Sequence, residues 1–403
     1  MRILYITPRF PYPPLKGDQV RSYNQIRVLS QKHSITLLSF VENREELNHV
    51  PMLKRFCSHI ETVELRPLRS YLNVGLGLFF PLPLQTHYYS SSEMRRKIRT
   101  VTENDSFDIV HVQLIRMAPY LAHFDKIPKV MDFIDALSLN MERRYRCDKG
   151  VLKLGAYIEW QRTKNYEGEV CKQFDRVTVV SPVDKEAIES FENINVNPLG
   201  VDTETFPFVP GWREPYSIIF TGNMGYFPNI EAMHYFAREI FPLIKVSVPE
   251  AKLYIIGANP PRSIRKLNAD KNIIVTGFVD SIHEYLARTT VAVCPIRAGS
   301  GMQFKILEAM STGTPVVATE YALGAIQATP GEDIIMANEP AEFAHQVIEL
   351  LSNPSLRQKL AVNARRLIEK KYTWEISVQQ LERIYEAAIM AHALRHKHSN
   401  VEP

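Results

Sequence analysis

The stretch that decides the fold is residues 299–317, "GSGMQFKILEAMSTGTPVV". It follows "VAVCPI" (291–296), a β-branched, apolar run typical of a buried strand. Two glycines around a serine predict a loop, apolar residues at helical spacing then predict a helix, and "PVV" begins another strand. The order strand, glycine loop, helix and strand is typical of a parallel sheet covered by helices.

The same stretch has the composition of an anion site. Glycines let backbone N–H groups approach a ligand closely, and the start of a helix favours a phosphate. Lys305 adds a mobile charge there, and Glu308 can accept hydrogen bonds from paired hydroxyls, as on a ribose. The alternative is structural: glycine for a turn, glutamate near a helix start and a solvated lysine. The residues by themselves leave both interpretations open.

Strand-like and helical runs alternate on both sides of this stretch. Before it come "ILYIT", "SITLLSF", "FDIVHVQ", "KVMDFI", "RVTVVS", "YSIIFTG", "AKLYIIG" and "NIIVTGF". A proline-rich segment at 197–215 interrupts the alternation and is interpreted as a linker. The pattern predicts an α/β protein with two doubly wound, Rossmann-like domains facing across a cleft, which is where ligands would bind. The expected boundaries are 1–198, 199–375 and a terminal helix over 376–403 that can cross back to the first domain.

Composition excludes several classes. The chain has 403 residues, 45% of them hydrophobic and 23% charged, with a formal charge of +4, too small for a dedicated nucleic-acid binder. Its four cysteines are dispersed, and "MRILYITPRF" predicts a strand rather than a signal sequence, so we expect a cytoplasmic protein. No D-x-D, His/Cys/Asp cluster, P-loop or early G-x-G-x-x-G occurs, so no metal, cofactor, NTPase or dehydrogenase is expected.

One lipophilic segment, "YLNVGLGLFFPLPL" (71–84), is too short to span a bilayer. Its first interpretation is a buried or half-buried loop. The alternative is a surface segment that dips into an anionic membrane beside the basic residues Arg95, Arg96, Lys97 and Arg99, which would place the protein at the inner face of the plasma membrane.

Several runs in order resemble the retaining nucleotide-sugar glycosyltransferases of family 4, which have the GT-B fold. "KILEAMSTGTPVVAT" resembles the signature of that family, and "NPLGVDTETF" its N-G-V-D-x-x-x-F linker motif. "FDIVHVQ", "TGNMGYFPN" and "VTGFVDSIHEYLARTTVAVCP" also match, so that the resemblance covers nearly the whole chain. "TPRFPYPPLKGDQVRSYNQI" and "DFIDALSLNMERRY" are similar to bacterial sugar transferases of exopolysaccharide and exosortase systems.

The resemblance implies roles for individual residues. It makes His111, Lys305 and Glu308 the candidate catalytic residues, although a lone histidine at the end of a strand is equally a hydrogen-bonded core residue. Asp18, Arg21 and Asp135 are expected on the acceptor side; the alternatives are a loop and cap ahead of a helix for the first two and a solvated helix face for the region of Asp135. The expected nucleotide-sugar contacts are Gly17, Gly222, Asn223, Phe278, Val279, Arg297, Gly299, Ser300, Gly301, Met302, Lys305 and Glu308.

The sequence also departs from the family. Ser300 occupies the place of the first of two usual glutamates, and Asn223 and Asn229 replace the usual Arg and Lys that hold the diphosphate. The charge of a leaving diphosphate has to be compensated. We therefore expect Arg297 and Lys305 to take that part, the alternative being two solvated surface charges.

The predicted function is transfer of a sugar, with retention, from a UDP- or GDP-linked donor to a saccharide acceptor, such as one carried on polyprenyl diphosphate, in exopolysaccharide or cell-surface glycan synthesis. A nucleotide-sugar epimerase and a non-catalytic scaffold of the same fold are the alternatives. An epimerase would change the free nucleotide sugar, a transferase would release the nucleoside diphosphate, and a scaffold would do neither.

Overall fold

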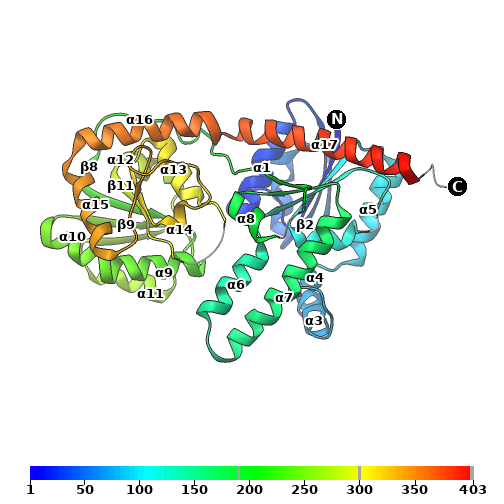
Figure 1. Cartoon of the computed structure of the whole chain (residues 1–403), viewed down its shortest axis with the longest axis horizontal. Helices are drawn as coiled ribbons and strands as arrows, with labels where there is room; N and C mark the ends of the chain where they lie inside the picture. Colours follow the sequence, from blue (N-terminus) through cyan, green and yellow to red (C-terminus); the bar gives the residue numbers. More distant parts are fainter. Residues whose placement is uncertain (123, 189–190, 298–300, 400–403) are drawn as a thin grey trace. The chain divides into compact units, whose positions relative to one another are not determined.

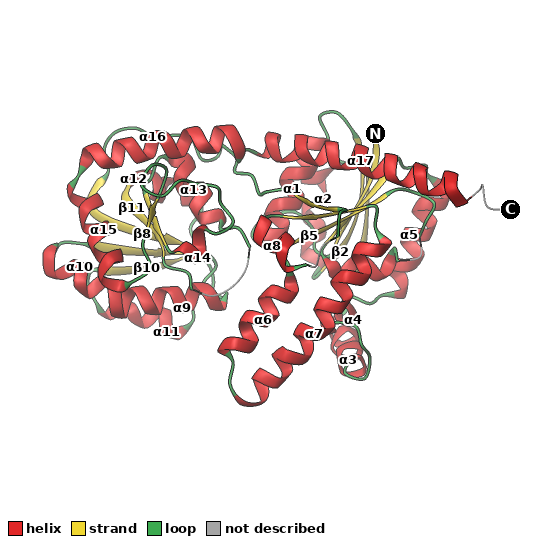
Figure 2. Cartoon of the chain, viewed as in Figure 1, coloured by secondary structure: helices red, strands yellow, loops and turns green. Residues whose placement is uncertain are grey.

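The chain is divided into two compact units. In the computed structural model, residues 1–122, 124–188, 191–297 and 301–399 are described (Figure 1). Unit 1 comprises Met1–Pro198 and Ser377–Pro403, and unit 2 comprises Leu199–Ile376. Each unit contains a parallel sheet with helices packed on it (Figure 2).

The sheet of unit 1 has the strand order β3-β2-β1-β4-β5-β6-β7 in the described residues. Its centre is apolar because strands buried on both faces need near-continuous apolar runs, and β1, β2 and β4 supply them. Ile3 pairs with Ile35 on one side and Ile109 on the other. The strands are β1 (Arg2–Thr7), β2 (Ser34–Val41), β3 (His59–Glu64), β4 (Ile109–Gln113), β5 (Lys129–Ile134), β6 (Arg176–Val179) and β7 (Ile194–Val196).

The helices of unit 1 follow its strands in the usual alternation, with two additions. The first is a pair of short helices, α3 and α4, and the second is a long hairpin formed by α6 and α7. The helices are α1 (Gly17–Leu29), α2 (Val50–Lys54), α3 (Pro67–Gly77), α4 (Leu84–Tyr88), α5 (Ser92–Asn104), α6 (Leu137–Cys147), α7 (Gly150–Gln173), α8 (Pro182–Ala187) and, from Ser377 onward, most of α17 (Trp374–Ser399).

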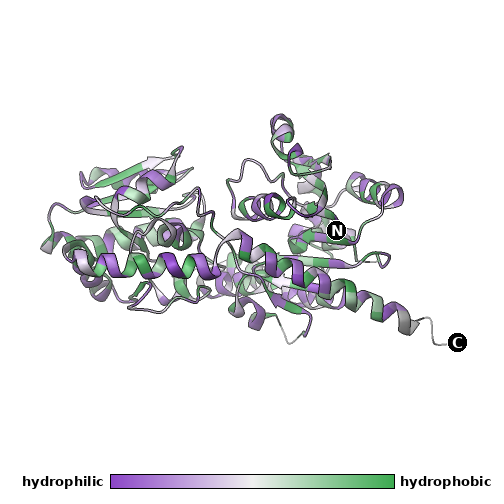
Figure 3. Ribbon diagram, turned by 90° about the horizontal axis from the view of Figure 1, so that it is seen from above, coloured by the Kyte–Doolittle hydropathy of each residue, from purple (hydrophilic) through white to green (hydrophobic). Residues whose placement is uncertain are grey.

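The sheet of unit 2 has the order β10-β9-β8-β11-β12-β13. Its strands are β8 (Glu214–Thr221), β9 (Lys252–Ile256), β10 (Ile273–Gly277), β11 (Thr289–Cys294), β12 (Val316–Ala318) and β13 (Ile335–Met336). Its helices are α9 (Phe227–Tyr235), α10 (Phe241–Ser247), α11 (Arg262–Arg265), α12 (Ile282–Arg288), α13 (Phe304–Thr312), α14 (Glu320–Leu323), α15 (Pro340–Ser352) and α16 (Pro354–Lys371). Polar and apolar residues alternate along the helices, as expected when one helix face is buried (Figure 3).

The predicted fold class, two parallel α/β sheets, is confirmed. The first interpretation of residues 71–84, a buried or half-buried loop, is wrong: α3 continues to Gly77, and most of the apolar side chains from Tyr71 to Phe80 are exposed. Among the described helices, none combines the length and the apolar composition that crossing a bilayer requires. The described residues hold no cluster of potential metal ligands.

Candidate functional site

The strand order of unit 2 defines a binding edge. β8 is followed in the sequence by β9 on one side and pairs with β11 on its other side, so the direction of winding reverses between β8 and β11. In doubly wound sheets, ligands bind outside the carboxyl ends of the strands at this switch. The loop after β8 and the loop between β11 and α13 are therefore the two segments that border the site.

The loop after β8 depends on glycine. Gly222 has a φ of +152°, and a Cβ at this position would lie 2.8 Å from Asn229 Nδ2 and 3.2 Å from Lys305 Cε. A Cβ on Gly257 would lie 1.8 Å from the carbonyl oxygen of Gly222. Backbone and side chains thus approach one another too closely here for any larger residue, which fixes the path of the loop.

Lys305 lies at the start of α13, under this loop. Its ammonium donates to Asn229 Oδ1 at 2.9 Å and to Gln303 Oε1 at 3.1 Å, and it lies 4.9 Å from the centre of the Phe220 ring. Burial lowers the pKa of Lys305, although the nearby Glu308 and Cys294 oppose the effect. Both hydrogen-bond acceptors are neutral amides, so they orient the ammonium without cancelling its charge.

Glu308 follows one turn later on the same helix. Burial raises the pKa of its carboxyl to about 7, with Lys305 acting in the opposite direction. Within the described part of the chain, no hydrogen bond to this carboxylate is formed. An oriented cation and a carboxylate with free acceptor sites, at the switch of a doubly wound sheet, can bind a phosphate and a diol together.

Arg297 is already engaged elsewhere. Its guanidinium forms an ion pair with Glu231 of α9, and it lies 3.5 Å from the centre of the Tyr235 ring. Both contacts hold the side chain against α9. Of the two cations expected to replace the diphosphate clamp, Lys305 lies against the loop after β8, whereas Arg297 is held against α9.

The remaining residues predicted in unit 2 border the same edge or lie outside the described residues. Gly301 has a φ of +82° and Met302 is buried, while Phe278 is exposed and Val279 half-buried just beyond β10. Gly299 and Ser300 belong to the segment that is not described. Asn223 caps its own turn, because its Oδ1 accepts a bond from the Gly225 N–H at 2.8 Å.

The second half of the decisive stretch serves the fold. Gly313 ends α13 in the left-handed region with a φ of +74°, and a Cβ there would lie 2.4 Å from the ring of Phe208. Thr314 donates its hydroxyl to the Leu286 carbonyl at 2.8 Å, and Arg213 donates to the Gly313 carbonyl at 2.8 Å. Residues 311–315 therefore fix the end of α13 in place rather than contact a ligand.

In unit 1, His111 lies inside the core. It has no exposed surface, stacks on Tyr5 with 4.2 Å between ring centres, and its Nδ1 is 2.9 Å from the hydroxyl of Tyr385. Burial lowers the pKa of His111 to about 4, so the ring is neutral at neutral pH. The structure thus gives His111 no surface for the predicted contact with a sugar, and it matches the alternative, a hydrogen-bonded core histidine.

Arg21 is also buried, against the expectation of a substrate contact. Its Nε and Nη2 donate to the two carboxylate oxygens of Asp132 at 2.6 and 3.2 Å, and Nη2 also donates to Asn197 Oδ1 at 2.8 Å. Neither Arg21 nor Asp132 has exposed surface. The pair acts as an internal brace between α1 and β5.

The other two predicted acceptor-side residues, Asp18 and Asp135, lie nearer the surface, as does Gly17, which was predicted to contact the nucleotide sugar. Gly17 begins α1, and Asp18 in its first turn accepts a bond from Arg9 at 2.7 Å. Asp135 follows β5 and is half-buried. Burial raises the pKa of Asp135 to about 7, and the neighbouring Asp184 acts in the same direction.

Comparison with known proteins agrees with this geometry. Residues 215–353, which include Gly222, Lys305 and Glu308, match the family described as "Glycosyl transferases group 1". A Klebsiella pneumoniae protein described as an "Uncharacterized 44.6 kDa protein in cps region" is 21% identical over 389 residues, covering 92% of this chain and 96% of that protein. The family match itself covers residues 215–353. It makes the chain a glycosyltransferase that uses a nucleotide-sugar donor.

The transferase has the GT-B fold, as its solved relatives show. Sucrose-phosphate synthase from Thermosynechococcus elongatus superimposes with a TM-score of 0.74 at 13% identity, covering 97% of this chain and all of that one. Anabaena HepE, solved with UDP-glucose, gives a TM-score of 0.66 at 14% identity over 96% of this chain and 100% of its own.

The sequence analysis did not name two residues of this glycosyltransferase as candidates for the site. Asn229, noted only as a departure from the family, holds the ammonium of Lys305. Gln113 ends β4, two residues after His111 and on the same face, and its Nε2 donates to the Asp18 carbonyl at 2.9 Å. Its place as the last residue of a strand run was the available signal, because strand ends border the binding edge.

Proposed function

We propose that this glycosyltransferase moves a sugar from a UDP- or GDP-linked donor to a saccharide carried on polyprenyl diphosphate, in the synthesis of an exopolysaccharide or another cell-surface glycan. One observation supports the binding of a nucleotide-sugar donor: Lys305 is hydrogen-bonded to Asn229 directly under Gly222, and Glu308 lies one turn further along the helix. Lys305 binds the diphosphate, and Glu308 accepts hydrogen bonds from the ribose.

The choice of donor and acceptor draws on relatives. Anabaena HepE was solved with UDP-glucose, which supports a nucleoside diphosphate sugar. The cps-region protein of Klebsiella supports a surface polysaccharide. A Bacillus subtilis poly(glycerol-phosphate) alpha-glucosyltransferase, 24% identical over 223 residues, half of this chain and 32% of that protein, supports an acceptor that carries phosphate.

The proposed reaction breaks the bond between the anomeric carbon and the oxygen of the donor phosphate. An acceptor hydroxyl forms the new bond on the same face, and its proton leaves with the nucleoside diphosphate. Positive charge develops on the sugar while negative charge develops on the leaving phosphate. A fixed ammonium beside that phosphate stabilises the transition state more than the ground state, which is the condition for catalysis.

Replacing Glu308 with glutamine should weaken the binding of UDP or GDP, whichever binds more tightly, by about 1–3 kcal/mol. The ribose hydroxyls would then lose a charged acceptor in a half-buried position, while the side-chain volume stays nearly constant. Isothermal titration calorimetry measures this directly. The matched control is Glu284→Gln, because Glu284 is an exposed carboxylate at the start of α12. Equal affinities for the wild type and Glu308→Gln would remove Glu308 from the site.

The same carboxyl should make nucleotide affinity depend on pH. Burial raises the pKa of Glu308 to about 7 in the free protein, and ribose hydroxyls donate to its ionised form. Affinity should therefore fall as the pH drops through 7, by up to about tenfold per pH unit below the pKa. Because UDP also titrates, the measurement is the ratio of wild-type to Glu308→Gln affinity at each pH from 6 to 8. A ratio that stays constant over this range would contradict the assignment.

A further inference from the structure

Helix α3 presents its apolar residues outward. Leu68, Leu72 and Leu76 are 84%, 70% and 65% exposed, and Phe79 in the following turn is 87% exposed. Large apolar side chains gathered on one face of a monomer mark a contact surface. We call these residues and their neighbours the α3 face: Leu68, Tyr71, Leu72, Leu76, Leu78, Phe79 and Phe80.

The protein side of α3 is small and polar. Ser70 and Gly77, seven residues apart and therefore on one helix face, are the buried residues of this helix. A Cβ on Gly77 would lie 2.5 Å from the ring of His87, and Asn73 donates to the Ser90 carbonyl at 3.2 Å. The close approach at Gly77 and the hydrogen bond from Asn73 fix the orientation of α3, so its apolar face is held outward.

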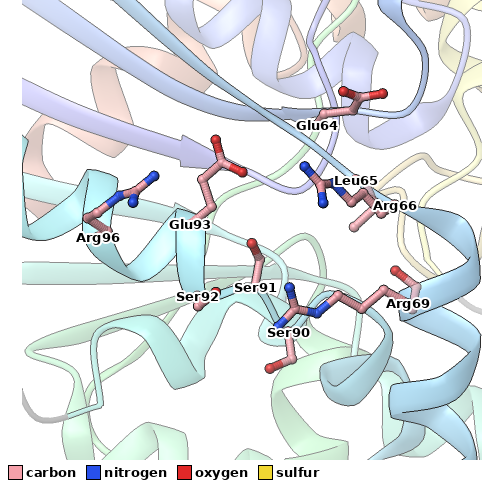
Figure 4. A pocket seen from close by; sticks show the side chains of 10 residues that line it. Glu64, Leu65, Arg66, Arg69, Ser90, Ser91, Ser92, Glu93 and Arg96 are labelled. Carbon is pink, nitrogen blue, oxygen red and sulfur yellow. The ribbon is translucent and has the colours of Figure 1, made fainter.

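A hollow of about 370 Å³ opens beside the first turn of α3 (Figure 4). Arg66 and Arg69 reach into it from the start of α3, and Arg96 lies across from them on α5. Three consecutive serines that precede and begin α5 complete its floor: Ser90, Ser91 and Ser92.

The guanidinium groups of the three arginines are available to a ligand. Among the described residues, none is paired by a hydrogen bond or ion pair to the guanidinium of Arg66, Arg69 or Arg96. Two carboxylates also line the hollow, Glu64 and Glu93, of which Glu64 is paired with Arg44 at 3.4 Å. The lining therefore has an excess of positive charge next to hydroxyl groups, which suits a phosphate group.

A second exposed apolar group lies on α7, the helix that contacts the turn after α3. Arg162 of α7 donates to the Leu78 carbonyl at 2.7 Å, and Glu159 of α7 accepts a bond from the Leu84 N–H at 3.0 Å, so α7 is joined to the turn after α3. The first turns of α7 expose Val151, Leu152 and Leu154, with Lys149 and Lys153 between and beside them. In Figure 1, α3 and the tip of the α6–α7 hairpin project from the same side of unit 1.

We propose that this side of unit 1 docks on an anionic lipid bilayer. The α3 face enters the interface between headgroups and acyl chains, and the arginine-lined hollow receives the phosphate of one lipid headgroup. This inference is independent of the proposed sugar transfer, because it uses neither the donor site nor an acceptor. Of the four basic residues expected from the sequence to meet headgroups, only Arg96 lines the hollow; Lys97 is paired with Glu61, and Arg66 and Arg69 had not been expected.

The chemistry favours a lipid over a protein as the occupant. A bilayer offers phosphate groups directly above hydrocarbon, and unit 1 offers an arginine-lined hollow directly beside an apolar helix face. Helices that lie in this interface have exposed leucine and aromatic residues on one side and basic residues at the boundary. The centre of a protein interface is usually flat and depleted of charge. A hollow surrounded by three arginines is unlike such a centre and suits a small anion.

The test is flotation of the whole chain with vesicles of phosphatidylcholine alone or mixed with phosphatidylglycerol. The wild type should bind the mixed vesicles and lose binding in high salt. Arg66→Gln/Arg69→Gln should bind them about 30-fold more weakly, because each arginine near an anionic surface strengthens binding about fivefold. Arg262→Gln/Arg265→Gln on α11 of unit 2 removes the same charge from two exposed positions and should bind as the wild type does.

The apolar contribution has its own variant. Leu72→Gln/Leu76→Gln should also lose binding, whereas Leu243→Gln/Val246→Gln on α10 should not. Absence of wild-type binding to mixed vesicles, or an equal loss in the arginine pair and its control, would overturn the proposal. Self-association of the wild type in sedimentation velocity, abolished by Leu72→Gln/Leu76→Gln without any vesicle binding, would overturn it in favour of a protein contact.

Discussion

Replacing Arg21 with alanine should lower the free energy of unfolding of unit 1 by about 3–5 kcal/mol. The substitution leaves the carboxylate of Asp132 without its bidentate partner at a position with no exposed surface. Thr178 still donates to Asp132 at 2.9 Å, but a neutral hydroxyl compensates a buried charge poorly. The side-chain oxygen of Asn197 would lose its donor as well.

Hydrogen exchange of peptides from β1, β4 and β5, followed by mass spectrometry, reports this loss in unit 1 separately from unit 2. Arg2→Ala is the matched control, since the Arg2–Asp105 pair is about half exposed on both sides and should contribute no more than about 1 kcal/mol. Asp132→Asn added to Arg21→Ala should recover part of the stability by removing the unpaired charge. If Arg21→Ala lowered the free energy of unfolding no more than Arg2→Ala does, the prediction would be contradicted.

Replacing Lys305 with alanine should reduce the turnover of the donor by about 10²–10³, as removal of a fixed electrostatic group at a developing charge does in other enzymes. The ammonium of Lys305 is held by two neutral amides at 2.9 and 3.1 Å, so its charge remains available to the leaving diphosphate. The rate of hydrolysis of UDP-glucose and GDP-mannose provides the readout without an acceptor. It is measured as the release of the nucleoside diphosphate.

Binding measurements separate a direct role from a structural one. Lys305→Ala should weaken the binding of UDP or GDP much more than the binding of uridine or guanosine. Only the diphosphate carries the charge that the ammonium compensates. Asn229→Ala should reproduce part of the effect by releasing Nζ, and Lys359→Ala on α16 serves as a control for the lost charge. Equal weakening of nucleoside and nucleoside diphosphate would mean that Lys305 supports the loop rather than the ligand.

Most of the strands and the decisive stretch could be predicted from the sequence because their signals are local. An apolar run, two glycines and a helical repeat follow one another within residues 291–317, and the structure forms β11, α13 and β12 from them. The edge strand β3 was missed because "HIETVE" alternates polar and apolar residues and sits at the rim of the sheet, where burial is partial.

The burial of the unit 1 residues could not be predicted in the same way. Asp132 and Asn197 lie 111 and 176 residues after Arg21, and Tyr385 lies 274 residues after His111. No local pattern indicates such partners, so a motif histidine and a loop arginine were expected at a substrate. The orientation of α3 was equally hidden, because composition shows that a helix is apolar but not which face the rest of the protein covers.

The return of the chain to unit 1 after Ile376 bears on the order in which the protein folds during synthesis. Unit 1 begins first, but its core needs Leu381 and Tyr385, and Asn197 donates to the Ser377 carbonyl at 2.8 Å. Unit 2 is one uninterrupted segment, Leu199–Ile376. Domains usually fold on the ribosome from the amino terminus onward. Here the unit encoded second can be completed first, and the first unit cannot complete its core until the residues after Ile376 have been translated.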